Sequence, residues 1–168
     1  MSEAEEPGEA HALAATAIGL LIRRGLTIGT AESLTGGLIA ATLTTVPGAS
    51  AAVRGGVVAY AADVKASLLG VPAALLSRVG TVHPEVAAAM AAGAIERLRV
   101  NVAIAVTGVA GPDPVDGLPV GTVHIALGSS AGMRHRPLRL TGDRARIRQA
   151  TVTNALSLLV SVLSEDNP

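Results

Sequence analysis

A hydroxyl residue, two glycines and a helix start lie close together early in the chain. Residues 26–30 form an apolar run typical of a strand, and residues 38–43 form an Ala/Leu/Thr run typical of a helix. Between them, the sequence Ala-Glu-Ser-Leu-Thr-Gly-Gly occupies positions 31–37. This arrangement would hold the Ser33 hydroxyl at the carboxyl edge of a sheet, where the helix N–H groups of Thr35, Gly36 and Gly37 could face a ligand. The alternative is that Ser33 or Thr35 only caps the helix.

The single lysine of the chain favours catalysis over capping. Lys65 stands beside twelve arginines, and Tyr60, five residues earlier, is the only Phe, Trp or Tyr. A neutral lysine can take the proton of a serine nucleophile, whereas arginine does not lose its proton in proteins. Tyr60 could orient that amine, and Thr107 could donate to a substrate or to Ser33. The alternative is a lone surface lysine beside an ordinary tyrosine at a strand end.

Two further segments could bind an anion. Thr107 begins a run of small residues (Gly108, Val109, Ala110, Gly111) able to present backbone N–H groups, although a plain turn is the simpler interpretation. The last helix opens with Gly142-Asp143-Arg144, followed by Arg146 and Arg148, which suits a phosphate or carboxylate and equally a solvated face. The four histidines are scattered without the spacing of metal ligands, so no metal site is expected.

Composition limits the class of protein. The 168 residues suit one domain; 49% are hydrophobic, and 13 basic residues balance 13 acidic ones. This balance argues against nucleic-acid or anionic-membrane binding, and the absence of cysteine excludes a thiol nucleophile. No apolar stretch is long enough to span a membrane, and the acidic start does not read as a signal peptide. We therefore expect a cytoplasmic protein with a disordered tail over residues 1–9 and one domain over residues 10–168.

Helices and strands alternate until a final hairpin. Strands are expected at 26–30, 54–60, 101–107, 120–127 and 134–140. Helices are expected at 10–24, 38–44, 64–69, 84–99 and 143–163, with Asp63 as the cap of the helix over 64–69 and a further short helix that ends near residue 77. This order predicts an α/β fold, a three-layer α/β/α sandwich with a mostly parallel, five-stranded mixed sheet.

Five motifs together resemble the CinA carboxyl-terminal domain family. They lie in order at residues 31–37, 58–60 with Lys65, 106–112, 119–123 and 142–144, and the likeness runs from about residue 10 to 163. Family members include stand-alone nicotinamide-nucleotide amidases, which are nicotinamide mononucleotide (NMN) deamidases. The resemblance implies hydrolysis of the NMN carboxamide to nicotinate mononucleotide and ammonia, in NAD salvage, without a cofactor or metal.

The resemblance also assigns roles to residues. It implies Ser33 as nucleophile, Lys65 as base, and Tyr60 and Thr107 as further catalytic residues. Substrate binding would fall to Thr35, Gly36, Gly37, Gly108, Ala110, Gly111 and Arg144. Leu34 stands where relatives commonly carry Cys, and the loop 113–118 departs from the usual pattern. The alternative function is a non-catalytic nucleotide-binding or adaptor module linked to competence or DNA damage. The Ala-rich helices make a homodimer or higher homo-oligomer plausible.

Overall fold

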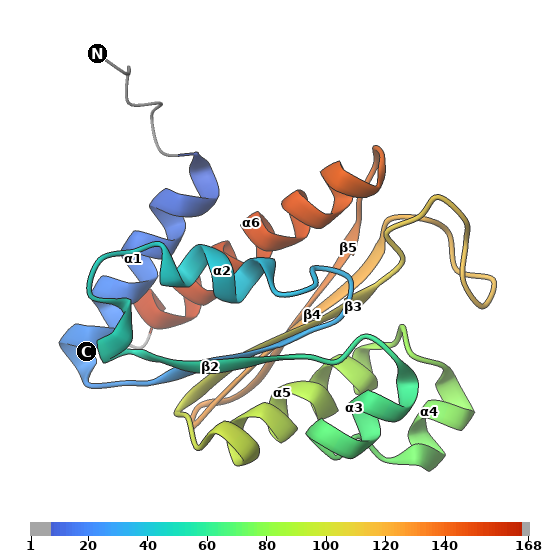
Figure 1. Ribbon diagram of the computed structural model, residues 1–168, viewed down its shortest axis with the longest axis horizontal. Helices are drawn as coiled ribbons and strands as arrows, with labels where there is room; N and C mark the ends of the chain where they lie inside the picture. The colour runs from blue at the N-terminus through green and yellow to red at the C-terminus, as the bar shows by residue number, and fades with distance from the viewer. Residues whose placement is uncertain (1–7, 166–168) are drawn as a thin grey trace.

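The computed structural model describes residues 8–165, which form one mixed sheet between two layers of helices (Figure 1). The strand order is β2-β1-β3-β4-β5, with β1 (Ile28–Glu32) parallel to β2 (Val53–Val58) and to β3 (Val102–Gly108). β4 (Thr122–Ser129) pairs antiparallel with β3 and with β5 (Gly132–Arg139), so it alone runs against the other four. The predicted fold class is therefore confirmed.

Helices on the two faces come from different parts of the chain. α1 (Glu9–Arg24), α2 (Leu38–Thr44) and α6 (Arg144–Glu165) cover one face, and α3 (Ala62–Leu69), α4 (Ala73–Val79) and α5 (Pro84–Leu98) cover the other (Figure 1). A 3-10 turn, η1 (Ala49–Ala51), precedes β2. Within residues 8–165, no helix combines the length and hydropathy needed to cross a membrane.

Element boundaries differ from the sequence prediction near the site. β1 continues to Glu32, so Ser33 follows the strand directly, and β2 ends two residues before Tyr60. Asp63 was expected to cap the helix that carries Lys65, and this was wrong: Ala61 is the N-cap, with Asp63 in the first turn. Of the predicted acidic tail, Glu9 already belongs to α1, and residues 1–7 lie outside the described residues.

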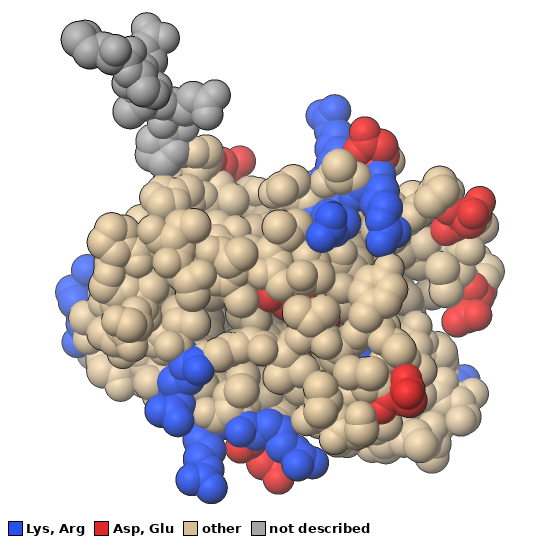
Figure 2. All heavy atoms as spheres, viewed as in Figure 1, with Lys and Arg blue, Asp and Glu red and all other residues tan. Residues whose placement is uncertain are grey.

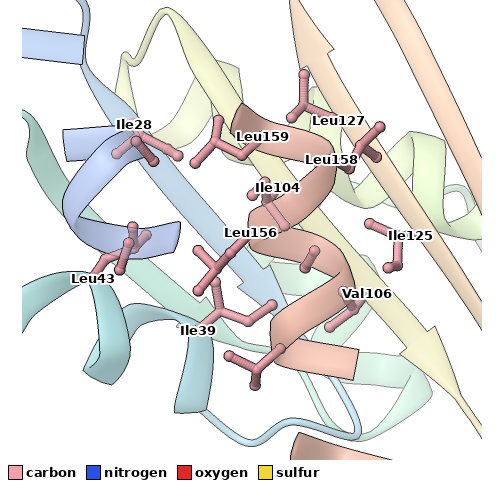
Figure 3. Packing of buried hydrophobic residues seen from close by; sticks show 14 of the residues in the cluster. Ile28, Ile39, Leu43, Ile104, Val106, Ile125, Leu127, Leu156, Leu158 and Leu159 are labelled. Atoms are coloured by element: carbon pink, nitrogen blue, oxygen red, sulfur yellow. The ribbon is translucent and has the colours of Figure 1, made fainter. Parts of the chain in front are cut away.

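The two faces of the sheet are packed differently. Large aliphatic side chains from the strands, α2 and α6 fill the first face, as Figure 3 shows for Ile104, Leu156 and Leu159. The second face is lined by Ala103, Ala105 and Ala126, against which the alanines of α5 pack. Small residues let this helix layer lie close to the sheet. α3, which packs on α5, therefore sits near enough for a side chain to reach the sheet edge.

α3 and α5 approach each other closely at Gly93 of α5. A Cβ at this position would lie 1.8 Å from the carbonyl oxygen of Leu69, the last residue of α3. We expect Gly93→Ala to lower the free energy of unfolding by about 1–3 kcal/mol, because backbone must move to admit the methyl group.

Gly19 of α1 provides the matched control. Its Cβ would meet only the end of the Arg23 side chain, at 3.3 Å. Gly19→Ala should raise stability by up to about 1 kcal/mol through helix propensity. Urea unfolding measures the free energy of unfolding of both variants. Equal and small changes in this free energy would show that α3 and α5 are not tightly packed at Gly93.

Candidate active site

Three parallel strands end side by side at one edge of the sheet, and each delivers part of the site. Ser33 follows β1, Ala59 and Tyr60 follow β2, and Thr107 lies near the end of β3. The Ser33 N–H donates to the Val106 carbonyl at 3.1 Å and the Ala59 N–H donates to the Glu32 carbonyl at 2.8 Å. The backbone pairing of the sheet thus extends into the site and fixes where these residues lie.

The Lys65 side chain reaches Ser33 from the face of the sheet that α3, α4 and α5 cover. It lies in α3, its side chain is fully buried, and its Nζ is 3.0 Å from Ser33 Oγ. Nζ also donates to the carbonyl oxygens of Ala59 at 2.7 Å and Tyr60 at 3.0 Å. The interpretation of Lys65 as a lone surface lysine is therefore wrong.

Burial changes the proton affinity of this amine. Desolvation disfavours the charged form and lowers the pKa of Lys65 from 10.5 to about 8. With a pKa of about 8, about a tenth of this amine is neutral at pH 7, and the neutral form is the one that a general base requires.

Glu32, which the sequence interpretation left without a role, anchors the turn that carries Ser33. Its buried carboxylate accepts hydrogen bonds from the hydroxyls of Thr30 at 3.1 Å and Thr35 at 2.7 Å. It also accepts the N–H groups of Ile39 at 2.8 Å and Ala40 at 3.0 Å. The N-cap residue of α2, Gly37, makes no side-chain capping bond, so Glu32 caps this helix from the preceding strand.

Tyr60 and Arg144 close one side of the site. Arg144, the first residue of α6, donates from Nη2 to the Tyr60 hydroxyl at 2.9 Å and from Nη1 to the Gly111 carbonyl at 2.7 Å. It thus connects the end of β2 with the loop after β3. Figure 2 shows basic side chains gathered over this end of α6, next to acidic ones on the β3–β4 loop.

A pocket of about 170 Å³ opens between these elements. Its lining includes seven residues that were predicted to be catalytic or to bind substrate. Other lining residues come from the Thr81 loop, the Ser33 turn and the loop after β3. The predicted members are Ser33, Tyr60, Thr107, Gly108, Ala110, Gly111 and Arg144, and the additional ones are Leu34, Thr81, Val82, Val109, Asp113 and Val115. Thr107 donates its hydroxyl to the Thr81 carbonyl at 2.7 Å, which holds that loop against the pocket.

Three residues expected to bind substrate lie outside the pocket lining. The Thr35 hydroxyl is committed to Glu32, and the Gly36 N–H donates to the Ser33 carbonyl at 3.0 Å. Gly37 takes a left-handed conformation, with φ of 99°, where the turn enters α2. All three help to build the turn behind Ser33, in which the Thr35 hydroxyl and the Gly36 N–H are already bonded and Gly37 supplies the left-handed backbone conformation.

The three arginines of α6 also separate into distinct positions. Arg144 lines the pocket, while Arg148 donates to the carbonyls of Leu34 and Thr35 on the other side of the Ser33 turn. The Arg146 side chain is exposed. Sequence spacing placed all three near a helix start but could not distinguish these directions.

Two of the four histidines, His124 and His135, contact each other outside the pocket lining. His124 Nδ1 lies 3.1 Å from His135 Nε2, and burial together with nearby His135, His83 and Arg139 lowers the pKa of His124 to about 4. Across residues 8–165, no three His, Asp or Glu side chains are placed to hold a metal ion.

The lowered pKa of Lys65 has a thermodynamic consequence. Between pH 8 and 10.5, the unfolded chain holds this proton while the folded chain releases it, so folding stability rises with pH in this window. We expect the unfolding free energy of the wild type to rise relative to that of Lys65→Met between pH 8 and 10.5, and the difference to be flat below pH 8. Urea unfolding over this range measures it, since Lys65→Met shares every other titrating group. A difference that stays constant across the window would contradict the lowered pKa.

Comparison with known proteins agrees with this architecture. The family model for the CinA C-terminal domain matches residues 10–163. A CinA-like protein of Frankia casuarinae is 51% identical over 157 residues, which cover 94% of this chain and 36% of the relative. A CinA-like protein of Geobacter sulfurreducens is 49% identical over 146 residues, which cover 86% of this chain and 35% of that protein. The chain thus spans about a third of the length of these relatives.

Solved structures match over nearly their whole length. The competence/damage inducible protein CihA of Agrobacterium tumefaciens superposes with a TM-score of 0.90 at 42% identity, covering 95% of this chain and 99% of that one. The competence damage-inducible protein A of Klebsiella pneumoniae gives a TM-score of 0.92 at 31% identity, covering 95% and 100%. From its sequence, its sheet and these relatives, the chain belongs to the CinA C-terminal domain family.

Proposed function

We propose that this domain is a serine–lysine amidase that hydrolyses the carboxamide of nicotinamide mononucleotide to nicotinate mononucleotide and ammonia. The observation that carries the proposal is the set of three oxygens around Lys65 Nζ. Two of them are carbonyls, which only accept hydrogen bonds, and the third is the Ser33 hydroxyl, which can also donate one. A neutral amine has two N–H groups and one lone pair. When its N–H groups bind the carbonyls of Ala59 and Tyr60, its lone pair faces Ser33.

Proton transfer follows from this arrangement. Ser33 Oγ attacks the amide carbon as its proton passes to Lys65 Nζ, 3.0 Å away. The C–O bond forms and the carbonyl oxygen takes up negative charge. Lys65 then returns the proton to the amide nitrogen, the C–N bond breaks and ammonia leaves. Water attacks the resulting ester, with Lys65 again as proton acceptor, and Ser33 is restored.

The oxyanion needs donors near Ser33. Among residues 8–165, the Leu34 N–H has no acceptor, and Leu34 lines the pocket next to the nucleophile. An N–H directly after a nucleophilic serine is a common oxyanion donor, and such a donor is worth about 3 kcal/mol. We assign this role to the Leu34 N–H in preference to Gly36, whose N–H is bound to the Ser33 carbonyl.

The pocket suits the amide end of the substrate. Its volume of about 170 Å³ is below the ~300–1,000 Å³ of sites that enclose a whole drug-sized ligand. The carboxamide and its ring would occupy it, while ribose and phosphate extend over the rim where Arg144 lies. The choice of nicotinamide mononucleotide itself comes from the family resemblance. The adaptor alternative would need the pocket to bind a nucleotide without turnover.

Three substitutions test the Ser33–Lys65 pair. Ser33→Ala should abolish ammonia release from nicotinamide mononucleotide while keeping the fold.

Lys65→Arg should be nearly as inactive as Lys65→Ala, because arginine keeps the charge but does not accept a proton. The wild-type kcat/KM should rise with pH along a limb near the lowered pKa of Lys65, about 8. Substantial turnover by Lys65→Arg would reduce Lys65 to an electrostatic anchor, and binding without turnover by the wild type would favour the adaptor function.

A second pair of measurements addresses the phosphate. If Arg144 binds it, nicotinamide riboside should be a far poorer substrate than the mononucleotide. Arg144→Ala should lower kcat/KM for the mononucleotide only, by about 1.5–3 kcal/mol. Steady-state kinetics with both compounds measure this difference, and an equal loss for both would assign Arg144 to the pocket wall alone.

A further inference from the structure

Arg148 binds the backbone of the Ser33 turn from the side opposite the strand end. From α6, its Nε donates to the Leu34 carbonyl at 2.9 Å and its Nη2 donates to the Thr35 carbonyl at 3.1 Å. Gly36 makes room for this contact, since a Cβ there would lie 3.3 Å from Nη2. One planar guanidinium therefore binds two consecutive carbonyls of the turn that carries the nucleophile.

Peptide geometry passes this constraint along the turn. The carbonyl and N–H of a trans peptide point in opposite directions. Because Arg148 holds the Thr35 carbonyl, the Gly36 N–H is directed away from Arg148, and it binds the Ser33 carbonyl at 3.0 Å. Because that carbonyl is held, the N–H of the same peptide, which belongs to Leu34, points away from Gly36 and stays without an acceptor among residues 8–165. Arg148 also holds the Leu34 carbonyl directly, and so orients the Thr35 N–H.

We propose that Arg148 is a positioning residue for the reaction, which keeps the peptide planes of the Ser33 turn in the orientation that offers backbone N–H groups to the oxyanion. A flipped Leu34–Thr35 peptide would turn an N–H toward the guanidinium and its carbonyl away, which the positive charge opposes. The contact also polarises both peptides and makes their N–H groups better donors. Arg148 does not line the pocket, so this role differs from that of Arg144.

Turnover kinetics distinguish an effect of Arg148 on the transition state from an effect on substrate binding. This assay rests on the proposed function. Arg148→Ala should lower kcat for nicotinamide mononucleotide roughly 10- to 100-fold, less than the ~10²–10³-fold cost of deleting an oxyanion donor outright. KM should change little and the pH limb of Lys65 should stay in place. Added methylguanidinium at non-denaturing concentration should restore part of kcat.

Arg146→Ala is the matched control. Arg146 lies two residues earlier on the same helix with an exposed side chain, so its loss should leave kcat unchanged. Arg148→Lys keeps the charge but replaces the planar fork by a single ammonium, and should recover only part of the activity. If Arg148→Ala loses no more activity than Arg146→Ala, the positioning role is wrong. A loss that matches the unfolded fraction and does not respond to methylguanidinium would equally overturn it.

A second readout does not depend on the substrate. A fluorophosphonate forms an Oγ–P bond with Ser33 and releases fluoride, and intact-mass spectrometry gives the rate. This rate should fall in Arg148→Ala and recover with methylguanidinium. If the wild type is labelled at Ser33 but does not release ammonia from nicotinamide mononucleotide, the proposed substrate is wrong while the Arg148 inference is still decided by the labelling rates. Equal labelling of wild type and Arg148→Ala would contradict the inference.

Discussion

The carboxylate of Glu32 is the interaction on which the arrangement of this site depends. It lies at the end of a strand that is buried along its whole length, and four donors surround it. Two of them are N–H groups from the first turn of α2, so the charge both caps the helix and fixes it against the strand. The Ser33 turn is the short connection between these two fixed elements. Its shape is therefore set from both ends before any catalytic side chain is considered.

Glu32 and Lys65 are two buried groups of opposite charge on either side of Ser33, and among the described residues they do not form an ion pair. Each is solvated by neutral dipoles, hydroxyl and N–H donors for the carboxylate and backbone carbonyls for the amine. An ion pair would raise the pKa of the lysine and keep it charged. Glu32 is bonded to the start of α2, Lys65 has no counterion within residues 8–165, and burial lowers the pKa of Lys65. The fold thus leaves a buried amine of lowered pKa beside Ser33, as the proposed base role requires.

Sequence patterns predicted the strand–turn–helix around Ser33, the mixed sheet and the single lysine beside the serine, because these depend on local periodicity and residue type. They could not predict which backbone groups of the turn stay free. Gly36 and Gly37 were expected to face a ligand, but the carbonyls of this turn are bonded by Arg148, which lies 114 and 113 residues away from Leu34 and Thr35. Glu32 gave no signal because two of its four partners are backbone N–H groups and the other two are threonine hydroxyls, which form no recognised motif with it. The Thr81 and Val82 wall of the pocket arises from the α4–α5 connection, which has no motif of its own.

The proposed chemistry requires the buried Lys65 amine to lose its proton at a pH close to neutral. This chain allows a direct measurement, because Lys65 is its only lysine and selective ¹⁵N-lysine labelling gives a single Nζ signal. NMR titration of that signal in the free protein reports the pKa without a substrate, an inhibitor or an assumed reaction. We expect a midpoint near 8, whereas a midpoint near the ordinary value of 10.5 would show that burial does not lower the pKa of Lys65.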